Sequence, residues 1–135
     1  RLMNLKAIHH VAIIVSDYEK SRDFYVNKLG FAVIREHHRP ERHDYKLDLR
    51  CGQAELEIFG NKTTDPAYQA PPKRLSFPEA CGLRHLAFRV ENIEAVVKEL
   101  ANQGIESLPI RKDDFTGEKM TFFFDPDGLP LELHE

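Results

Sequence analysis

The chain has 135 residues, of which 41% are hydrophobic and 30% are charged, and its formal net charge is −3 at pH 7. This length and composition predict a globular chain of one domain, or of two small modules that share a core. The slightly acidic balance argues against a nucleic-acid-binding surface, and no apolar run approaches the ~20 residues that a membrane-spanning helix needs.

The N-terminal residues and the cysteine content predict the cellular compartment. The first four residues lack the apolar core and cleavage site of a signal peptide. Only Cys51 and Cys81 are present and they form no CxxC pair, so a disulfide framework is not expected. We therefore expect a cytoplasmic protein in which both cysteines are buried as small hydrophobic residues.

The first half of the chain predicts one helix and four strands. The apolar run of residues 8–15 predicts a strand that is buried on both faces. Ser16 or Asp17 then caps a helix, with Glu19 placed for a capping box from Ser16, and Gly30 ends this helix. Three further strands are expected at residues 31–36, 45–50 and 54–59, with a turn at 51–53.

The second half repeats this order. A strand over residues 85–90 leads to an Asn92 cap and to a helix that ends at Gly104. The Asp-Pro-Asp-Gly sequence of residues 125–128 predicts a tight turn. Three strands are expected at about 105–110, at 119–124 and at 129–134.

Residues 60–79 separate the two halves and hold four of the eight prolines, which favours a linker over a helix or a central strand. We therefore expect residues 1–135 to form one domain built from two βαβββ modules. Module one covers about residues 5–60, the linker about 61–80 and module two about 81–135.

A constant offset relates four polar residues of the two halves. His10 and His85 lie 75 positions apart (85 − 10), and so do Glu57 and Glu132 (132 − 57). The flanking residues keep this register, since His-Val-Ala-Ile-Ile-Val at 10–15 corresponds to His-Leu-Ala-Phe-Arg-Val at 85–90. If the halves close on each other, two imidazoles and two carboxylates form a ligand set for one divalent metal.

Strand geometry separates these residues from their neighbours. Side chains alternate along a strand, so His10 and His9 point to opposite faces, and His9 is expected to be packed or solvated. Glu57 and Glu132 lie in apolar strands, where an unpaired carboxylate is costly and a metal would remove that cost. Glu55 fits the wet face of an edge strand instead.

Other histidines and aromatic residues are expected to have supporting roles. His134 shares a face with Glu132 and could orient it. Phe122–Phe124 are expected in the core rather than stacked on a cofactor. A charged loop at the rim of the site could steer an anionic substrate, and it contains Arg35, His37, His38, Arg39, Arg42 and His43.

In these motifs the chain resembles the vicinal oxygen chelate superfamily, and within it the glyoxalase I (lactoylglutathione lyase) group, over nearly its whole length. The resemblance implies an α+β fold in which paired βαβββ modules form an open, eight-stranded barrel-like sheet. It also implies one divalent metal ion (Ni, Co or Zn) held by His10, Glu57, His85 and Glu132. The matching motifs are residues 10–17, Ser-Arg-Asp-Phe-Tyr at 21–25, Leu-Gly-Phe at 29–31, Leu-Glu at 56–57, Gly-Leu-Arg-His at 82–85 and residues 125–132.

The resemblance further implies a reaction. A substrate with two adjacent oxygens binds the metal, which stabilises an enediolate, while a carboxylate moves a proton from one carbon to the next. By similarity, Glu132 is the first candidate for this base and Glu57 the second. The group forms a lactate thioester from the hemithioacetal of methylglyoxal. Its members are commonly homodimers, so the expected partners are a small molecule, such as a thiol adduct, and a second copy of the chain.

Two departures from the group concern the thiol. Glutathione-dependent members often carry an Arg four positions after the first metal His, where this chain has Ile14. The expected glutathione-binding Asn falls at Gly60, one place before Asn61. An Ile does not replace a charged anchor, so the identity of the thiol stays open.

Three alternatives share this scaffold: a metal-dependent thiol transferase, a ring-cleaving extradiol dioxygenase and a non-catalytic drug-binding protein. The dioxygenases resemble an iron site of two His and one carboxylate, so the presence of both Glu57 and Glu132 favours the four-ligand lyase pattern. Drug-binding relatives typically lack the metal set, which this chain has in full.

Overall fold

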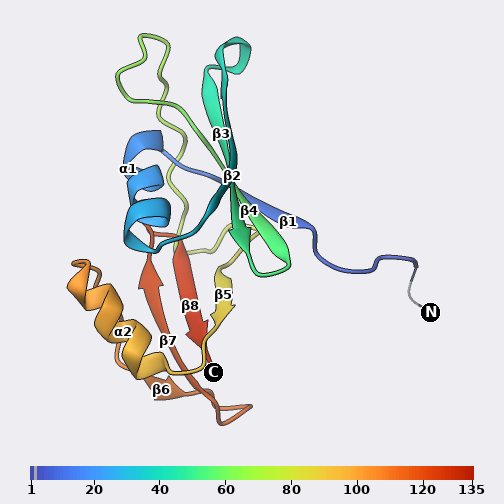
Figure 1. The fold of residues 1–135 in the computed structure, drawn as a ribbon, viewed down its shortest axis with the longest axis vertical. Helices are drawn as coiled ribbons and strands as arrows, with labels where there is room; N and C mark the ends of the chain where they lie inside the picture. The colour runs from blue at the N-terminus through green and yellow to red at the C-terminus, as the bar shows by residue number, and fades with distance from the viewer. Residues whose placement is uncertain (2) are drawn as a thin grey trace. The chain divides into compact units, whose positions relative to one another are not determined.

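The computed structural model describes residue 1 and residues 3–135, and these form two four-stranded sheets (Figure 1). The chain divides into two compact units, Arg1–Pro71 and Pro72–Glu135. Each unit contains one βαβββ module, as the sequence predicted. None of the helices formed by the described residues is long and apolar enough to span a membrane.

The sheet of the first unit has the strand order β1-β4-β3-β2. Strand β1 pairs with β4 in parallel, and the other pairs are antiparallel. A parallel pair needs a crossover connection, which the helical segment after β1 begins; Figure 1 shows this segment alongside the sheet. The elements are β1 (His10–Ile14), α1 (Tyr18–Arg22) with its π-helical continuation η1 (Asp23–Lys28), β2 (Val33–Arg39), the 3-10 turn η2 (Pro40–Arg42), β3 (Asp44–Cys51) and β4 (Ala54–Gly60).

One face of this sheet carries the core of the first unit. Leu47 and Leu49 of β3 and Ile58 of β4 are fully buried, and Tyr25 of η1 is fully buried as well. Because side chains alternate along a strand, the residues between these apolar positions point to the opposite face. That face, here called the polar face, carries charged side chains of β2, β3 and β4.

The second unit repeats this topology, with the strand order β5-β8-β7-β6 and a parallel β5–β8 pair. Its core includes Leu131 and Leu133 of β8, Phe123 of β7 and Ile93 of the helix, all at most 3% exposed. The elements are β5 (Leu86–Arg89), α2 (Ile93–Asn102), β6 (Arg111–Lys112), β7 (Lys119–Phe124) and β8 (Pro130–His134).

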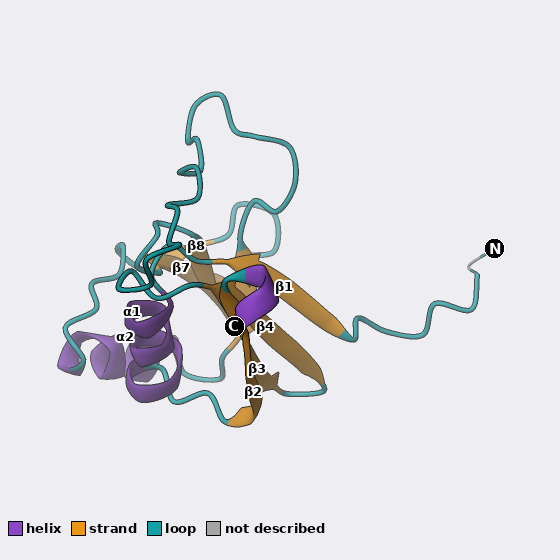
Figure 2. Ribbon diagram, turned by 90° about the horizontal axis from the view of Figure 1, so that it is seen from above, coloured by secondary structure: helices purple, strands orange, loops and turns teal. Residues whose placement is uncertain are grey.

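Turns and a long connection join these elements. Between β4 and β5 the chain runs as loops and turns, with one isolated bridge between Ser76 and Glu79 (Figure 2). The predicted Asn92 cap is confirmed, since its side chain accepts a hydrogen bond from Ala95 N at 3.1 Å. The predicted turn before β8 is confirmed too, because Asp125 accepts hydrogen bonds from the backbone N–H groups of Asp127 and Leu129.

The structure corrects the prediction for the first strand and its helix. Strand β1 is shorter than residues 8–15 and is not buried on both faces, because the face that carries His10, Ala12 and Ile14 is exposed; Ile14 is 75% exposed. Asp17 is the helix cap and accepts from Lys20 N, so the capping box from Ser16 is wrong. Glu19 lies 3.4 Å from the Lys62 ammonium instead.

Two further predictions were wrong. The strand expected at residues 105–110 does not form, and the two-residue strand β6 takes its place in the sheet. Leu108 N donates to Phe122 O of β7 at 2.8 Å, but Pro109 has no N–H to donate, and the Leu108 carbonyl accepts from the Thr121 hydroxyl at 2.6 Å. Cys81 is exposed rather than buried, and Cys51 is half-buried, where burial raises the pKa of its thiol.

Candidate metal centre

The two His–Glu pairs occupy equivalent positions in the two units. In the parallel ladder of the first unit Ala12 pairs with Glu57, and His10 lies two residues before Ala12. In the second unit Ala87 pairs with Glu132, and His85 again lies two residues before Ala87. His10 therefore begins the strand beside the one that carries Glu57, and His85 immediately precedes the strand beside the one that carries Glu132.

The side chains of each pair meet. His10 Nε2 lies 3.6 Å from Glu57 Oε2, and His85 Nε2 lies 3.3 Å from Glu132 Oε1. Both glutamates are 8% exposed, whereas the His10 and His85 side chains are 43% and 28% exposed. Each unit thus holds a nearly buried carboxylate next to a partly accessible imidazole.

The donor atoms of each pair fit a divalent metal. Neighbouring donors on one cation, with bonds of about 2.1 Å, lie about 3.0–3.4 Å apart. The separations of 3.3 and 3.6 Å lie close to this range. A nitrogen and an oxygen donor in each pair suit Zn, Ni or Co. Each pair can therefore supply two ligands to such an ion.

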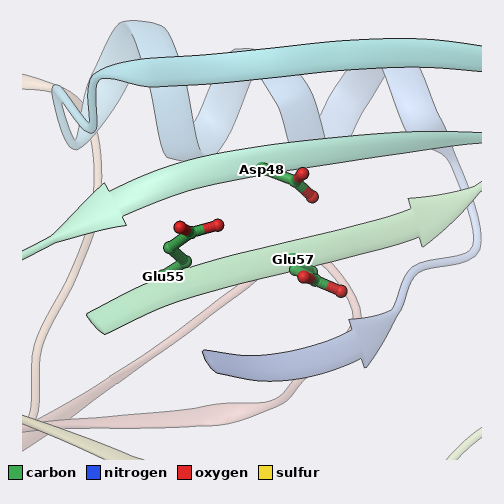
Figure 3. Close-up of side chains that lie close together, drawn as sticks. All are labelled: Asp48, Glu55 and Glu57. Carbon is green, nitrogen blue, oxygen red and sulfur yellow. The ribbon is translucent and has the colours of Figure 1, made fainter. Parts of the chain in front are cut away.

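The carboxylate of Glu57 lies among charged side chains on the polar face. Figure 3 shows it near Asp48 of β3 and Glu55 of β4, and the ligand atoms of these three acids lie within 4.8 Å of one another. The Lys46 ammonium is 2.8 Å from both carboxylate oxygens of Asp48 and 3.6 Å from Glu57 Oε2. Arg35 lies 2.7 Å from both Asp48 and Glu55. Arg50 adds a third basic neighbour, 3.8 Å from Glu55 Oε2, so each acid of this cluster has a cationic partner.

These neighbours correct one prediction and add residues that the sequence analysis missed. Glu55 is not on a wet edge strand, since β4 lies inside the sheet and Glu55 is only 9% exposed. Asp48 and Lys46 have no partner at the 75-residue offset that could have revealed them. The hairpin could have done so, because the register that pairs Cys51 with Ala54 also pairs Asp48 with Glu57.

The carboxylate of Glu132 has different neighbours. Its register partner on β7 is Phe122, whose ring meets the His85 ring edge-on with centroids 5.3 Å apart. Its one ion pair among the described residues is with His85. Phe122 therefore belongs to the surroundings of the pair rather than to the core, whereas Phe123 is a core residue and Phe124 is 44% exposed.

Among the described residues, the remaining histidines form no ion pair with Glu57 or Glu132. His9 Nδ1 is 2.9 Å from His10 Nδ1. His37 and His38 are exposed, but they belong to β2 and not to a loop; His38 stacks on Tyr45 with centroids 4.4 Å apart. His43 forms the turn after η2, and His134 Nδ1 lies 3.3 Å from Glu135 O.

A second charged cluster connects α1 to β2. Arg22 Nε lies 2.8 Å from Glu36 Oε2, and the Tyr18 hydroxyl donates to the same oxygen. The hydrogen bond from Arg22 lowers the pKa of Glu36. Burial, and then the Glu36 carboxylate, raise the pKa of Tyr18. This cluster stabilises the helix against the sheet.

The positions that depart from the glutathione-dependent pattern differ in their surroundings. Ile14 lies on the same face of β1 as His10 and pairs with Phe59. A Cβ at Gly60 would lie 2.6 Å from Val15 Cγ2 and 2.8 Å from Val15 O, so a side chain does not fit there. Asn61 Nδ2 donates to Asp65 at 3.1 Å, which holds the following loop.

Curated relatives match almost the whole chain. The Bacillus subtilis (strain 168) protein YwkD is 56% identical over 98% of this chain and 99% of its own length. Human mitochondrial methylmalonyl-CoA epimerase is 32% identical over 98% of this chain and 75% of its own length. Glyoxylase I 4 of Arabidopsis thaliana is 27% identical over 97% of this chain, and the glutathione transferase FosA of Serratia marcescens is 30% identical over 96%.

Solved structures agree in fold. The protein SMU.1112c is 71% identical, with a TM-score of 0.96 over 98% of this chain and all of the other. A glyoxalase family protein from Enterococcus faecalis is 62% identical, with a TM-score of 0.87 over 98% of this chain and all of the other. A family profile matches residues 7–133. The chain is therefore a member of the Glyoxalase/Bleomycin resistance protein/Dioxygenase superfamily.

Proposed function

We propose that this chain is a metal-dependent enzyme of the glyoxalase I type. It would convert the hemithioacetal of a 2-oxoaldehyde and a thiol into a 2-hydroxyacyl thioester. The observation that carries this proposal is the contact of one His with one Glu at equivalent register positions of both units. Members of the superfamily are often enzymes and typically bind a divalent metal, which supports the proposal.

The proposed ligands are His10, Glu57, His85 and Glu132, and the proposed metal is Ni, Co or Zn. When bound, a divalent cation supplies Lewis-acid stabilisation of negative charge on the substrate oxygens. The residues of this chain then have to hold the ion, orient the substrate and move one proton. The imidazoles suit the first task, because neutral imidazole nitrogen is a common ligand of such ions.

We assign the proton transfer to Glu132 because its neighbours leave it free to move. Among the described residues its one ion pair is with His85, and its register partner is the apolar Phe122. Glu57 is also close to the Lys46 ammonium, which would hold it in place. A carboxylate in reach of the reacting carbon can act as a general base and then as a general acid.

The proposed step conserves atoms and electrons. Glu132 removes the proton from the carbon that bears sulfur and hydroxyl, and it returns that proton to the neighbouring carbonyl carbon. The hydroxyl proton moves to the former carbonyl oxygen, and a new C=O forms at the carbon bonded to sulfur. The product is an isomer of the hemithioacetal, so no oxidant or reductant is needed.

The test is thioester formation from methylglyoxal and glutathione by protein that has been stripped of metal and reloaded with Ni, Co or Zn. Glu132→Gln should lower kcat by at least about 100-fold, since it removes the base. Glu94→Gln is the matched control, because Glu94 is an exposed acid of the same unit that pairs with Lys119. Metal-loaded Glu132→Gln that retains wild-type kcat would refute the assignment.

A second candidate function is epimerisation next to a thioester carbonyl. Two observations favour it: the 32% identity with human methylmalonyl-CoA epimerase exceeds the 27% identity with the plant Glyoxylase I, and Ile14 stands where glutathione-dependent members often carry Arg. Both reactions remove a proton from a carbon next to a carbonyl group.

Turnover in D2O distinguishes the two candidates. Methylmalonyl-CoA that exchanges its C2 hydrogen for deuterium, while methylglyoxal with glutathione does not react, would favour the epimerase. If neither substrate reacts although metal binds, the search moves to other thiols and to the thiol transferase and dioxygenase alternatives. A ligand that binds tightly without turnover would favour the non-catalytic alternative. The expected homodimer stays a prediction, which light scattering would test.

A further inference from the structure

The two His–Glu pairs differ at the positions opposite their glutamates. On β3, Asp48 pairs with Glu57 and Lys46 lies two residues before it. On β7, Phe122 pairs with Glu132, and Met120 lies two residues before it. An acid and a base in the first unit thus correspond to two apolar residues in the second unit.

The ammonium of Lys46 lies between two carboxylates. It is 2.8 Å from both oxygens of Asp48 and 3.6 Å from Glu57 Oε2. His10 Nε2 approaches the same Oε2 atom, also at 3.6 Å. A divalent metal held by His10 and Glu57 would therefore meet a resident positive charge at one of its own ligand atoms.

Asp48 determines where this ammonium stays. The Asp48 carboxylate is fully buried and accepts from Lys46 and from Arg35 Nε. The shorter distances from Lys46 to Asp48 than to Glu57 indicate that Asp48 draws the ammonium away from Oε2. If Asp48 were removed, Glu57 would be the nearest carboxylate to the Lys46 ammonium.

We propose that Lys46, anchored by Asp48, is a positioning residue that competes with the metal for Glu57 Oε2 and thereby sets the metal affinity of the centre. This inference rests on the proposed function, because it takes His10 and Glu57 as ligands. It makes the two glutamates unlike, because Glu57 has the Lys46 ammonium as a neighbour and Glu132 has no ion pair with Lys or Arg among the described residues.

The inference predicts that two substitutions change the Kd for Co(II) in opposite directions. The Kd is measured from the visible absorption of Co(II). Lys46→Met, which copies Met120 of the second unit, removes the competing charge and should tighten binding about tenfold. Asp48→Asn removes a negative charge and leaves the ammonium to Glu57, so it should weaken binding by a similar factor. A purely structural role would weaken binding in both variants.

Controls separate this effect from a general change of charge. Lys46→Arg should keep the wild-type Kd within about threefold, because it retains a positive charge there. Lys62→Met removes a lysine that instead contacts Glu19 and the Tyr45 ring, and it should leave the Kd unchanged. In a Glu57→Gln background, most of the gain from Lys46→Met should disappear, since the two residues act on one oxygen atom.

The outcomes are distinct. The inference is overturned, while the proposed function stands, if Lys46→Met binds Co(II) no more tightly than wild type. It is also overturned if Lys46→Met gives the same gain in affinity in the Glu57→Gln background. Wild-type Co(II) affinity in His10→Ala and Glu57→Gln would refute the ligand assignment, and both proposals fall together. Circular dichroism verifies the fold of each variant; if Asp48→Asn does not fold, the Lys46 and Glu57 variants still decide the question.

Discussion

Arg35 provides a test of how the polar face is stabilised. Its guanidinium lies 2.7 Å from Asp48 Oδ2 and 2.7 Å from Glu55 Oε1. Asp48 is fully buried, and the Glu55 side chain is only 10% exposed. Substitution of Arg35 by Met keeps the aliphatic part of the side chain and removes the charge. The substitution therefore removes one ion-pair partner from each of two poorly solvated carboxylates, Asp48 and Glu55.

The expected cost follows from the exposure of the three groups. Removing one partner of a buried ion pair costs about 3–5 kcal/mol, whereas an exposed pair contributes about 0–1 kcal/mol. Arg35 itself is 43% exposed, and Lys46 still neutralises Asp48 in the variant. We therefore expect Arg35→Met to lower the free energy of unfolding by about 2 kcal/mol, between the two limits.

Urea denaturation followed by circular dichroism measures this change as a lower midpoint at an unchanged slope. Arg84→Met is the matched control, because Arg84 makes a similar pair of hydrogen bonds to Glu79 at the surface. We expect no measurable shift of its midpoint. Equal losses in the two variants would refute the reasoning, since burial of the partner would then not determine the value of the pair.

Three further predictions concern packing and pH. Gly60→Ala should lower the free energy of unfolding by about 1–3 kcal/mol, because its Cβ would overlap Val15; thermal and urea melts measure it. Ile58→Ala should cost about 2–5 kcal/mol in the same melts, since Ile58 is fully buried. Arg22 lowers the pKa of Glu36, so that pairing stabilises the fold above the ordinary pKa and is lost as pH falls through the lowered one. Glu36→Gln should therefore make stability less dependent on acid pH, which melts over an acid pH series would test.

Much of the fold could be predicted from local sequence. Strand β7 formed at the predicted residues 119–124, and the Asn92 cap and the turn before β8 also formed as predicted. Such features depend on residues close in sequence, so the chemistry of one segment is sufficient to predict them. The failed strand at 105–110 shows the limit, because Leu108 bonds both to the Phe122 carbonyl and to the Thr121 hydroxyl of β7, while Pro109 has no N–H to continue the ladder.

The candidate ligands could be predicted because duplication leaves a trace in sequence. His10, Glu57, His85 and Glu132 repeat at one offset, and each His also lies in or next to an apolar strand. Whether these residues bind a metal remains a prediction that the loading experiments test. The contacts that distinguish Glu57 from Glu132 leave no such trace, because no repeat relates Lys46 or Asp48 to charged residues of the second half.

Sequence alone thus determined the order of elements, the duplication and the candidate donors, all of which are local or periodic. Only the tertiary structure decided the surroundings of each carboxylate. Strand pairing places Asp48 opposite Glu57 and Phe122 opposite Glu132. A shift of the register by one residue would turn these side chains to the other face of the sheet. The electrostatic difference between the two glutamates is therefore a property of the pairing between strands.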